Sequence, residues 1–247
     1  MSLHPSPAEV RRLWDFEDPV ASESRLRAAA DASTSAVWTT QIARALGLQE
    51  RTTEALALLD GIAGHDDPVV RAWSTLERGR ALRSDGDPEQ AERWFAEAVE
   101  AARTADLPFL EVDALHMLAL VAPPDEALAA HLRALEAART ASDPHTSTWE
   151  CSILTNIGMT HADAGAWPEA LTAFEEARAA ALRLPDAEQR LLVADWMVAW
   201  ALRHLGRRAE ALEVQRDLRR RHEAAGTSDP YVEEELAMLG DEGATRS

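Results

Sequence analysis

The sequence predicts an all-α protein, a solenoid of antiparallel helix pairs, and three observations lead to this fold class. Ala, Leu, Glu and Arg dominate the 247 residues while Val and Ile are few, a composition that favours helix. No run shows the alternation of apolar and polar residues that is typical of a β-strand. Alanine-centred segments recur around positions 55, 91, 127, 170 and 211, in steps of 36, 36, 43 and 41 residues. A near-constant step of this length indicates a stacked array of helical repeats.

Each repeat is expected to contain two helices, as the fourth repeat illustrates. Leu154, Ile157 and His161 lie three or four residues apart, as on one helix face. Gly165 then predicts a helix end, and Pro168 predicts the start of the next helix. The dipeptide Asp-Pro is expected to begin a helix wherever it occurs, because Asp accepts hydrogen bonds from first-turn amides and Pro loses no needed donor there. These dipeptides are residues 18–19, 67–68, 87–88, 143–144 and 229–230.

The repeats predict a division of the chain into three parts. Residues 1–35 are expected to hold an N-terminal helical segment or half-repeat, with one helix over residues 18–33. Residues 36–225 are expected to form about five helix pairs. Residues 226–247 are expected to form a C-terminal capping helix over residues 229–240, followed by a frayed tail at 241–247. Glu233, Glu234 and Glu235 would give this helix the polar exposure that a terminal cap needs.

The order of small and aromatic residues resembles the tetratricopeptide repeat (TPR) family over residues 36–225. The second repeat carries Gly79, Leu82, Gly86, Ala91, Phe95 and Ala98, and the fourth carries Gly158, His161, Gly165, Ala170, Phe174 and Ala177. The resemblance implies a right-handed superhelix in which Gly158 faces Ala170 and Phe174 packs between layers. In the third repeat Leu115 replaces the small residue, and in the fifth Gln215 replaces the aromatic one. The two longer steps predict longer helices or loops near residues 140–150 and 183–190.

Composition and motifs argue against several classes of function. The formal net charge of −18 disfavours nucleic acids and anionic membrane surfaces as partners. The longest apolar stretch, residues 115–122, is too short to span a membrane and no signal-peptide core is apparent, so a cytoplasmic protein is expected. Cys151, the single cysteine, is expected to be a buried hydrophobe. No phosphate loop, nucleophile elbow or metal-ligand spacing is present, so no catalytic residue, metal or cofactor is expected.

The resemblance also implies a binding site, because the first helix of each pair lines a concave groove in this family. A protein or peptide segment is therefore the expected partner. Arg and Trp, which are enriched at binding hot spots, fall on the groove side, and the arginine fork suits a partner with acidic groups. Asn156, the only asparagine, lies where peptide-binding members of the family hold the ligand backbone. The candidate peptide-binding residues are Arg44, Trp73, Arg80, Arg83, His116, Asn156, Met159, Trp196, Trp200 and Arg203.

Structural interpretations compete with these assignments. An arginine on a helix face often pairs with a nearby glutamate, Trp73 and Trp200 can be core between layers, and His116 and His131 can be buried or rim residues. The favoured hypothesis is a non-catalytic peptide-binding scaffold. The alternatives are a ligand- or peptide-sensing module of a bacterial signalling or transcription system, and an enzyme with an unfamiliar helical site. Neither end carries an obvious basic DNA-binding module, which disfavours the transcription-system alternative unless a partner supplies that module. Exposed tryptophans would favour a homo-oligomer.

Overall fold

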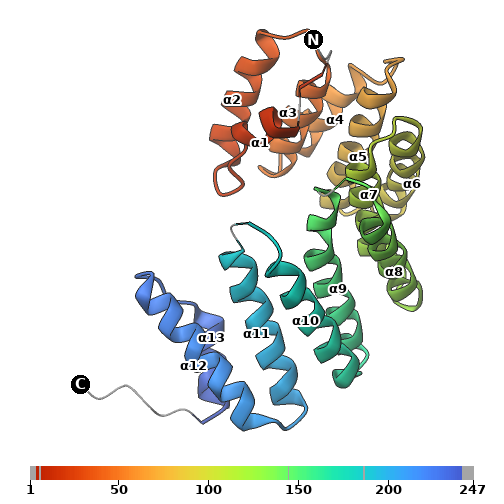
Figure 1. The fold of residues 1–247 in the computed structure, drawn as a ribbon. Coiled ribbons are helices and arrows are strands. Elements are labelled where there is room, and N and C mark those ends of the chain that lie inside the picture. Colours follow the sequence, from red (N-terminus) through yellow and green to blue (C-terminus); the bar gives the residue numbers. More distant parts are fainter. Residues whose placement is uncertain (1–3, 6, 144, 186, 241–247) are drawn as a thin grey trace. The chain divides into compact units, whose positions relative to one another are not determined.

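The computed structural model describes residues 4–5, 7–143, 145–185 and 187–240. Over these residues the regular structure is entirely helical, which confirms the predicted all-α class (Figure 1). The expected frayed tail, residues 241–247, lies outside the described residues. The chain divides into two compact units, Met1–Ala137 and Ala138–Ser247, and each is described separately below as unit 1 and unit 2.

Unit 1 is a succession of helices in which each helix from α1 to α7 packs on its neighbours in sequence. The first helices of the second and third pairs also pack on the first helices that precede them, α5 on α3 and α7 on α5. The helices are α1 (Pro7–Leu13), α2 (Pro19–Asp31), α3 (Val37–Gly47), α4 (Thr52–Asp60), α5 (Pro68–Ser84), α6 (Pro88–Thr104), α7 (Pro108–Val121) and α8 (Pro124–Thr140), whose last residues belong to unit 2.

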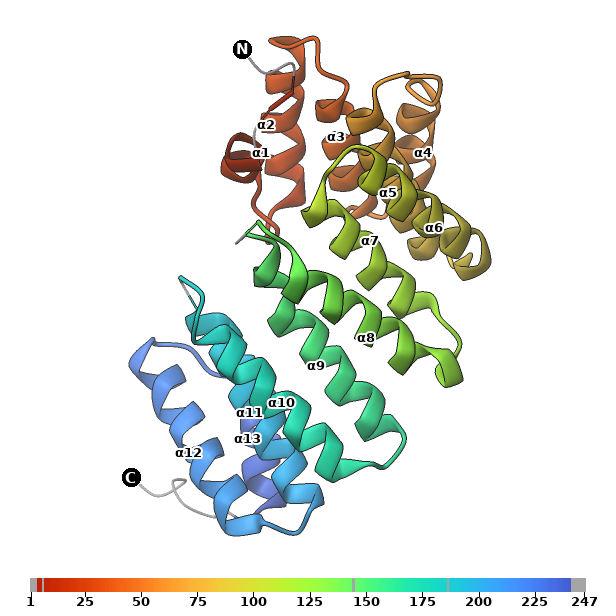
Figure 2. The same cartoon turned by 45° about the vertical axis from the view of Figure 1, so that its right-hand side comes forward.

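Unit 2 repeats the same scheme. The helix pairs α9–α10 and α11–α12 stack as layers, with α11 against both helices of the preceding pair and α13 against α12 (Figure 2). Its elements are the 3₁₀ helix η1 (Thr146–Thr148), α9 (Trp149–Asp163), α10 (Trp167–Ala181), α11 (Glu188–His204), α12 (Arg208–Ala224) and α13 (Pro230–Met238).

The longer sequence steps arise in the connections between pairs. Three residues separate α6 from α7, whereas eight residues, including η1, separate α8 from α9, and six separate α10 from α11. The extra residues predicted near 140–150 and 183–190 therefore lie mainly in these connections. From α5 to α12 the helices keep similar lengths of 14–17 residues, whereas α3 and α4 of the first pair have 11 and 9.

Aspartate caps begin the helices as the sequence predicts. In four of the five Asp-Pro dipeptides an Asp oxygen accepts a hydrogen bond from an amide of the first turn, at 2.9–3.0 Å. Such caps satisfy amides that have no partner within the helix. The capped helices are α2 (Asp18), α5 (Asp67), α6 (Asp87) and α13 (Asp229). The fifth dipeptide behaves differently, because Asp143 accepts from the amide of His145 at 3.1 Å ahead of η1 rather than beginning α9. Its partner Pro144 lies outside the described residues.

Glycines end the first helices of the second and fourth repeats as expected. Gly86 and Gly165 have φ values of +86° and +73°, in the left-handed region that glycine adopts without strain. The first repeat lacks this glycine, and Glu50, which lies 36 residues before Gly86, adopts a φ of +60° at the equivalent turn. Asp106, between α6 and α7, also has a left-handed φ of +54°. The repeat geometry therefore imposes this conformation even where the sequence supplies a less suitable residue.

The glycines inside the first helices make room for aromatic rings. A Cβ added to Gly79 would lie 2.5 Å from the Phe95 ring, and one added to Gly158 would lie 2.3 Å from the Phe174 ring. The three atoms nearest to that Cβ position at Gly158 belong to Phe174, so the ring is the group nearest to Gly158. The expected contact between Gly158 and Ala170 stays a prediction.

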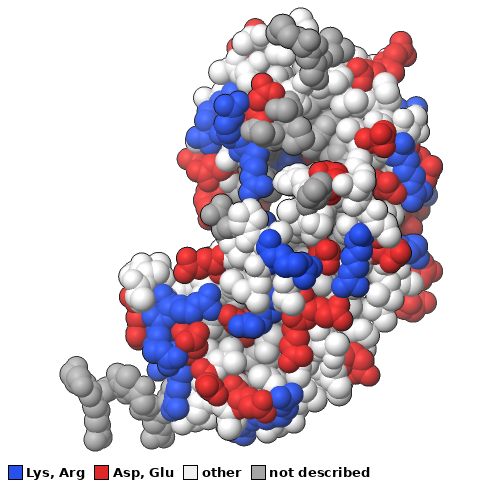
Figure 3. Space-filling view, viewed as in Figure 1, with Lys and Arg blue, Asp and Glu red and all other residues white. Residues whose placement is uncertain are grey.

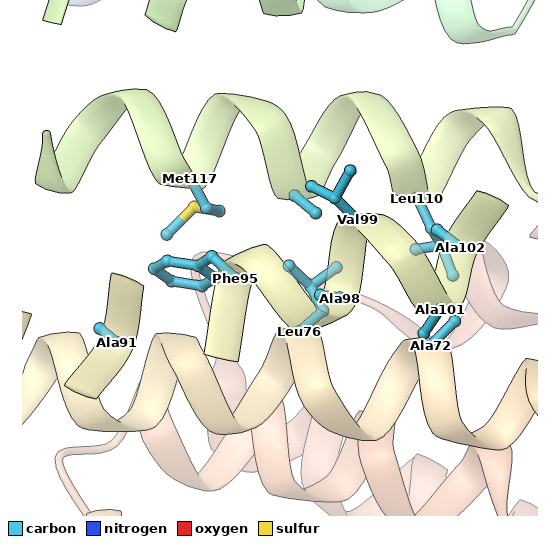
Figure 4. Close-up of a cluster of buried hydrophobic side chains, with 11 residues drawn as sticks. Ala72, Leu76, Ala91, Phe95, Ala98, Val99, Ala101, Ala102, Leu110 and Met117 are labelled. Atoms are coloured by element: carbon cyan, nitrogen blue, oxygen red, sulfur yellow. The ribbon is translucent and has the colours of Figure 1, made fainter. Parts of the chain in front are cut away.

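Both rings also contact the next layer. Phe95 is fully buried in a cluster that includes Leu110 and Met117 of α7, and Figure 4 shows Met117 directly above its ring. Phe174 shares a cluster with Val198 and Leu202 of α11. Each phenylalanine thus fills the space within its own pair and joins that pair to the following one.

Candidate binding faces of the first helices

Repeat-equivalent positions form two rows along the first helices. Steps of 36, 43 and 41 residues relate the members of each row, and the character of the residues changes along the chain. One row is Gln41, Glu77, Asp113, Asn156 and Met197, and the other is Arg44, Arg80, His116, Met159 and Trp200. The rows are charged or polar in unit 1, whereas in unit 2 their members are apolar apart from Asn156.

In unit 1 these rows make a series of ion pairs, here termed the charged ladder: Arg44, Glu77, Arg80 and Asp113. The Nη1 atom of Arg80 lies 2.6 Å from Glu77 Oε1, and its Nη2 atom lies 2.5 Å from Asp113 Oδ1. The Nη1 atom of Arg44 lies 3.6 Å from the same Glu77 oxygen. The ladder therefore connects α3, α5 and α7, the first helices of three consecutive pairs.

The carboxylates of the ladder are buried, and this fixes the role of Arg80. The side chains of Glu77 and Asp113 are 0% and 3% exposed. Burial opposes the charged form of Arg80, but Asp113 and Glu77 outweigh that effect and raise its pKa above its ordinary value. Arg80 thus pairs with internal carboxylates, in agreement with the alternative that an arginine on a helix face pairs with a nearby glutamate.

Arg44 is held less closely. Its 3.6 Å separation from Glu77 exceeds hydrogen-bond distance, and its side chain remains 26% exposed. Its guanidinium carbon lies 5.7 Å from the centroid of the Trp14 ring and 5.5 Å from that of Phe16. The two rings stack with centroids 4.9 Å apart, and Trp14 Nε1 donates to Gln41 Oε1 at 3.0 Å. Trp14 and Phe16, which the sequence analysis did not single out, therefore border this end of the ladder.

His116 continues the arginine row and is buried beside His131, with ring centroids 6.2 Å apart. The pKa of His116 is lowered to about 4, mainly by burial and also by the neighbouring His131, Arg80 and Arg83, while Asp113 opposes this shift. Burial also lowers the pKa of His131. Both rings are neutral near pH 7. In the described part of the chain, no group of three or more His, Cys, Asp or Glu residues could hold a metal ion.

The two remaining candidates in unit 1 differ in exposure. Arg83, at the end of α5, is exposed and makes no ion pair with any described residue. Trp73 is half-buried and packs against the cluster that contains Phe95. Trp73 thus packs in the core, as the alternative to a binding role proposed for it, whereas Arg83 is accessible.

In unit 2 the corresponding face carries aromatic side chains, here termed the aromatic row: Trp167, Trp196, Trp200, His204 and Tyr231. Trp196, Trp200 and His204 follow one another at intervals of four along α11 and share one helix face. Trp196 stacks on Trp200 at 5.9 Å, and Trp167 from α10 stacks on His204 at 3.7 Å. Tyr231 of α13 meets Trp196 edge-on at 6.2 Å and is 65% exposed.

Ion pairs flank the aromatic row. Arg203 Nε and Nη2 donate to the two Glu235 oxygens at 2.7 and 2.8 Å, a bidentate bond that raises the pKa of Arg203. Glu235 is buried at 4% exposure, so the expected exposure of all three cap glutamates is corrected for this residue. Asp195 accepts from Arg178 and from Arg221, the latter at 2.7 Å. Over α12, arginine and acidic side chains lie beside one another at the surface (Figure 3).

Asn156 and Met159 lie one turn apart on α9, and both are half-buried. The Asn156 side chain makes no hydrogen bond to any described residue, whereas Met159 packs against the cluster that contains Phe174. Cys151, at the start of α9, is buried as expected, and burial raises the pKa of its thiol. No helix in the described ranges has both the length and the hydrophobicity needed to cross a bilayer.

Comparison with known proteins identifies the repeat. Residues 151–184, which include Gly158 and Phe174, match the family model of the tetratricopeptide repeat. The chain resembles the TPR family. The predicted resemblance to this family is confirmed, and the fold is a TPR-like solenoid of helix pairs. A search of curated proteins found no match.

Solved structures show the same fold at low sequence identity. BtubC (BKLC) from P. vanneervenii is 15% identical, with a TM-score of 0.65 over 90% of this chain and 89% of that one. The quorum sensor NprR from B. thuringiensis, in its apo form, is 15% identical, with a TM-score of 0.65 over 93% of this chain and 66% of that one. A Rap protein complexed with competence and sporulation factor is 12% identical, with a TM-score of 0.62 over 92% of this chain and 69% of that one.

Proposed function

We propose that this chain is a non-catalytic scaffold that binds a protein or peptide segment along the faces of its first helices. The observation that carries the proposal is the alignment of repeat-equivalent residues. Successive first helices pack on one another within each unit, so the residues at equivalent positions form continuous rows rather than isolated points. An extended segment can contact such a row at regular intervals, which is how repeat arrays use their surfaces.

The polar groups that remain available support a partner with acidic groups. Arg80 and Arg203 are saturated by internal carboxylates and serve to hold the helices together. Arg83, Arg44 and the amide of Asn156 lack close hydrogen-bond partners among the described residues and can interact with a ligand. Trp196 and Trp200 would supply apolar contact, although much of each ring already packs within the aromatic row.

The structural neighbours favour a second candidate, a sensing module of a bacterial regulatory system. The similar structures include a quorum sensor and a protein complexed with a competence and sporulation factor. A sensor would respond to its ligand in helices that the ligand does not touch, whereas a passive scaffold would not. Hydrogen exchange with and without a selected ligand separates the two.

The test is selection from a displayed library of random peptides on the full chain. We expect enriched peptides with shared acidic and apolar positions, and weaker binding as salt concentration rises. Arg83→Glu should weaken binding of enriched peptides that contact unit 1, and Asn156→Ala that of peptides that contact unit 2, while Arg93→Glu, at an exposed arginine of α6, serves as the matched control. Arg80→Glu is unsuitable as a test, because it would place a third carboxylate against Glu77 and Asp113. Failure to enrich any peptide, or equal loss in the control, would contradict the proposal.

A further inference from the structure

We propose that Arg44, Trp14 and Phe16 form a subsite that binds an acidic side chain of the partner together with the apolar residue next to it. The inference rests on the proposed binding function and adds a named site within unit 1. It includes Trp14 and Phe16, which lie outside the repeat array in the segment between α1 and α2.

Arg44 is the under-neutralised member of the charged ladder. Glu77 Oε1 is engaged at 2.6 Å by Arg80, which leaves Arg44 at 3.6 Å from that oxygen. The Arg44 side chain donates no hydrogen bond to the described part of the protein, although a guanidinium has five N–H donors. A carboxylate from a ligand can take two of these donors in the fork geometry that Arg offers.

The position of Arg44 keeps it accessible to such a group. Its side chain is 26% exposed, compared with 16% for Arg80, and the rings of Trp14 and Phe16 lie beside its guanidinium group. The repeat-equivalent partners also differ. Arg80 is paired with Glu77 on its own helix, α5, and with Asp113 on α7. On α3 the position equivalent to Glu77 is the neutral Gln41, so Arg44 has no acidic partner one turn before it on its own helix.

The two rings provide the apolar half of the subsite. Phe16 is 60% exposed, an unusual state for a large aromatic side chain, and it stacks on Trp14. The segment that carries them is held in place, because Trp14 Nε1 donates to Gln41 and the Asp15 amide donates to Ser22 Oγ at 2.8 Å. A fixed, exposed ring beside an arginine fits a ligand in which an apolar residue adjoins an acidic one.

The probes are short synthetic peptides with acetylated N-termini and amidated C-termini. One contains Glu-Phe, a second replaces Glu with Gln, and a third replaces Phe with Ser. A fourth is the Glu-to-Gln peptide with a free C-terminal carboxylate, so that a chain terminus is tested as a separate source of the carboxylate. Binding is followed by fluorine NMR of the full chain labelled with 5-fluorotryptophan, in which Trp14→Phe assigns the Trp14 resonance.

We expect the Glu-Phe peptide to shift the Trp14 resonance saturably, and the Gln and Ser peptides to bind about tenfold more weakly, since the charged bond or the ring contact is lost. Arg44→Gln and Phe16→Ala should weaken the Glu-Phe peptide similarly, with Arg44→Lys intermediate because it keeps the charge without the fork. Arg93→Gln should change nothing. Circular dichroism verifies that each variant remains helical.

Three results would overturn the subsite: no saturable shift of Trp14 at millimolar peptide, an undiminished shift in Arg44→Gln, or a shift that requires the free C-terminus. The library selection distinguishes these failures from failure of the wider proposal. Peptides that still bind the full chain, but are insensitive to Arg44 and Phe16, would retain the scaffold function and remove only this subsite.

Discussion

Units 1 and 2 use the same repeat positions for different chemistry. The row that reads Arg44, Arg80 and His116 in unit 1 continues as Met159 and Trp200 in unit 2. In the first unit Arg44 and Arg80 join neighbouring helices through ion pairs with buried carboxylates, and in the second Trp200 contacts the rings of Trp167 and Phe174 on α10. The layered architecture is the same in both, so it does not depend on which kind of contact fills this row.

What the two units share is a glycine–phenylalanine contact inside one helix pair of each. Gly79 accommodates the Phe95 ring in unit 1, and Gly158 accommodates the Phe174 ring in unit 2, at nearly identical separations. These contacts set the helix spacing because the rings are fully buried and the glycines leave no room for a side chain. The residues on the first-helix faces can therefore vary with the ligand while the fold is maintained.

The largest expected effect is on the stability of unit 1, and it comes from breaking the charged ladder. Arg80→Ala should lower the free energy of unfolding by about 3–5 kcal/mol, because it leaves the buried Asp113 without its cation and Glu77 with only the more distant Arg44. Urea unfolding measures the total change, and hydrogen exchange should locate the loss in α5 and α7 rather than in α9 to α12. Arg93→Ala, at a surface ion pair, should cost less than about 0.5 kcal/mol. Equal effects of the two variants would show that the ladder contributes little.

The corresponding stability test in unit 2 removes a ring from the aromatic row. Trp200→Ala should cost about 3 kcal/mol, through lost apolar burial and the gap left beside Phe174 and Trp167. Trp200→Phe should cost clearly less, because it retains a ring. Here hydrogen exchange should increase in α10 and α11 with little change in α3 to α6. A uniform increase across both units would contradict their separate stabilisation.

The shared glycine–phenylalanine contact should respond alike in both units. Gly79→Ala and Gly158→Ala should each lower the free energy of unfolding by about 1–3 kcal/mol, because the added methyl group forces a buried ring to move. Thermal unfolding of each variant provides the comparison. Gly47→Ala, which adds a methyl group where nothing lies within 4 Å, is the control and should be neutral or stabilising. A clear difference between the first two variants would mean that the units are not built alike.

The smallest expected effect is a pH dependence of the free energy of unfolding, which should arise in unit 1. Burial lowers the pKa of His116 to about 4 from an ordinary value of 6.5, so the unfolded chain binds more protons between these values. This contribution to stability is complete above pH 6.5 and declines as the pH falls, by about 1–2 kcal/mol on reaching pH 5. Urea unfolding of the wild type and of His116→Leu, each at a pH above 6.5 and at pH 5, separates the contribution of His116 from that of other groups. An unchanged pH dependence in the variant would show that His116 does not contribute.

Local and periodic features were predictable from the sequence because they depend on neighbouring residues. Asp18 and Asp87 cap helices through amides three residues away, and Gly86 and Gly165 end helices through their own backbone freedom. The repeat step likewise follows from the spacing of the alanine-centred segments, and it predicts that Arg44, Arg80 and His116 lie on one face. The all-α class followed from these signals, and the resemblance to the repeat family followed from the order of small and aromatic residues.

Only the tertiary structure decided which charges are paired and which residues are accessible. Arg80 and Arg203 are engaged by Asp113 and Glu235, which are 33 and 32 residues distant, and no local pattern marks such partners. Trp14 and Phe16 lie outside the repeats, so periodicity could not bring them to Arg44. The physical reason is that helix formation depends on nearby residues, whereas pairing, burial and exposure depend on how the helices pack.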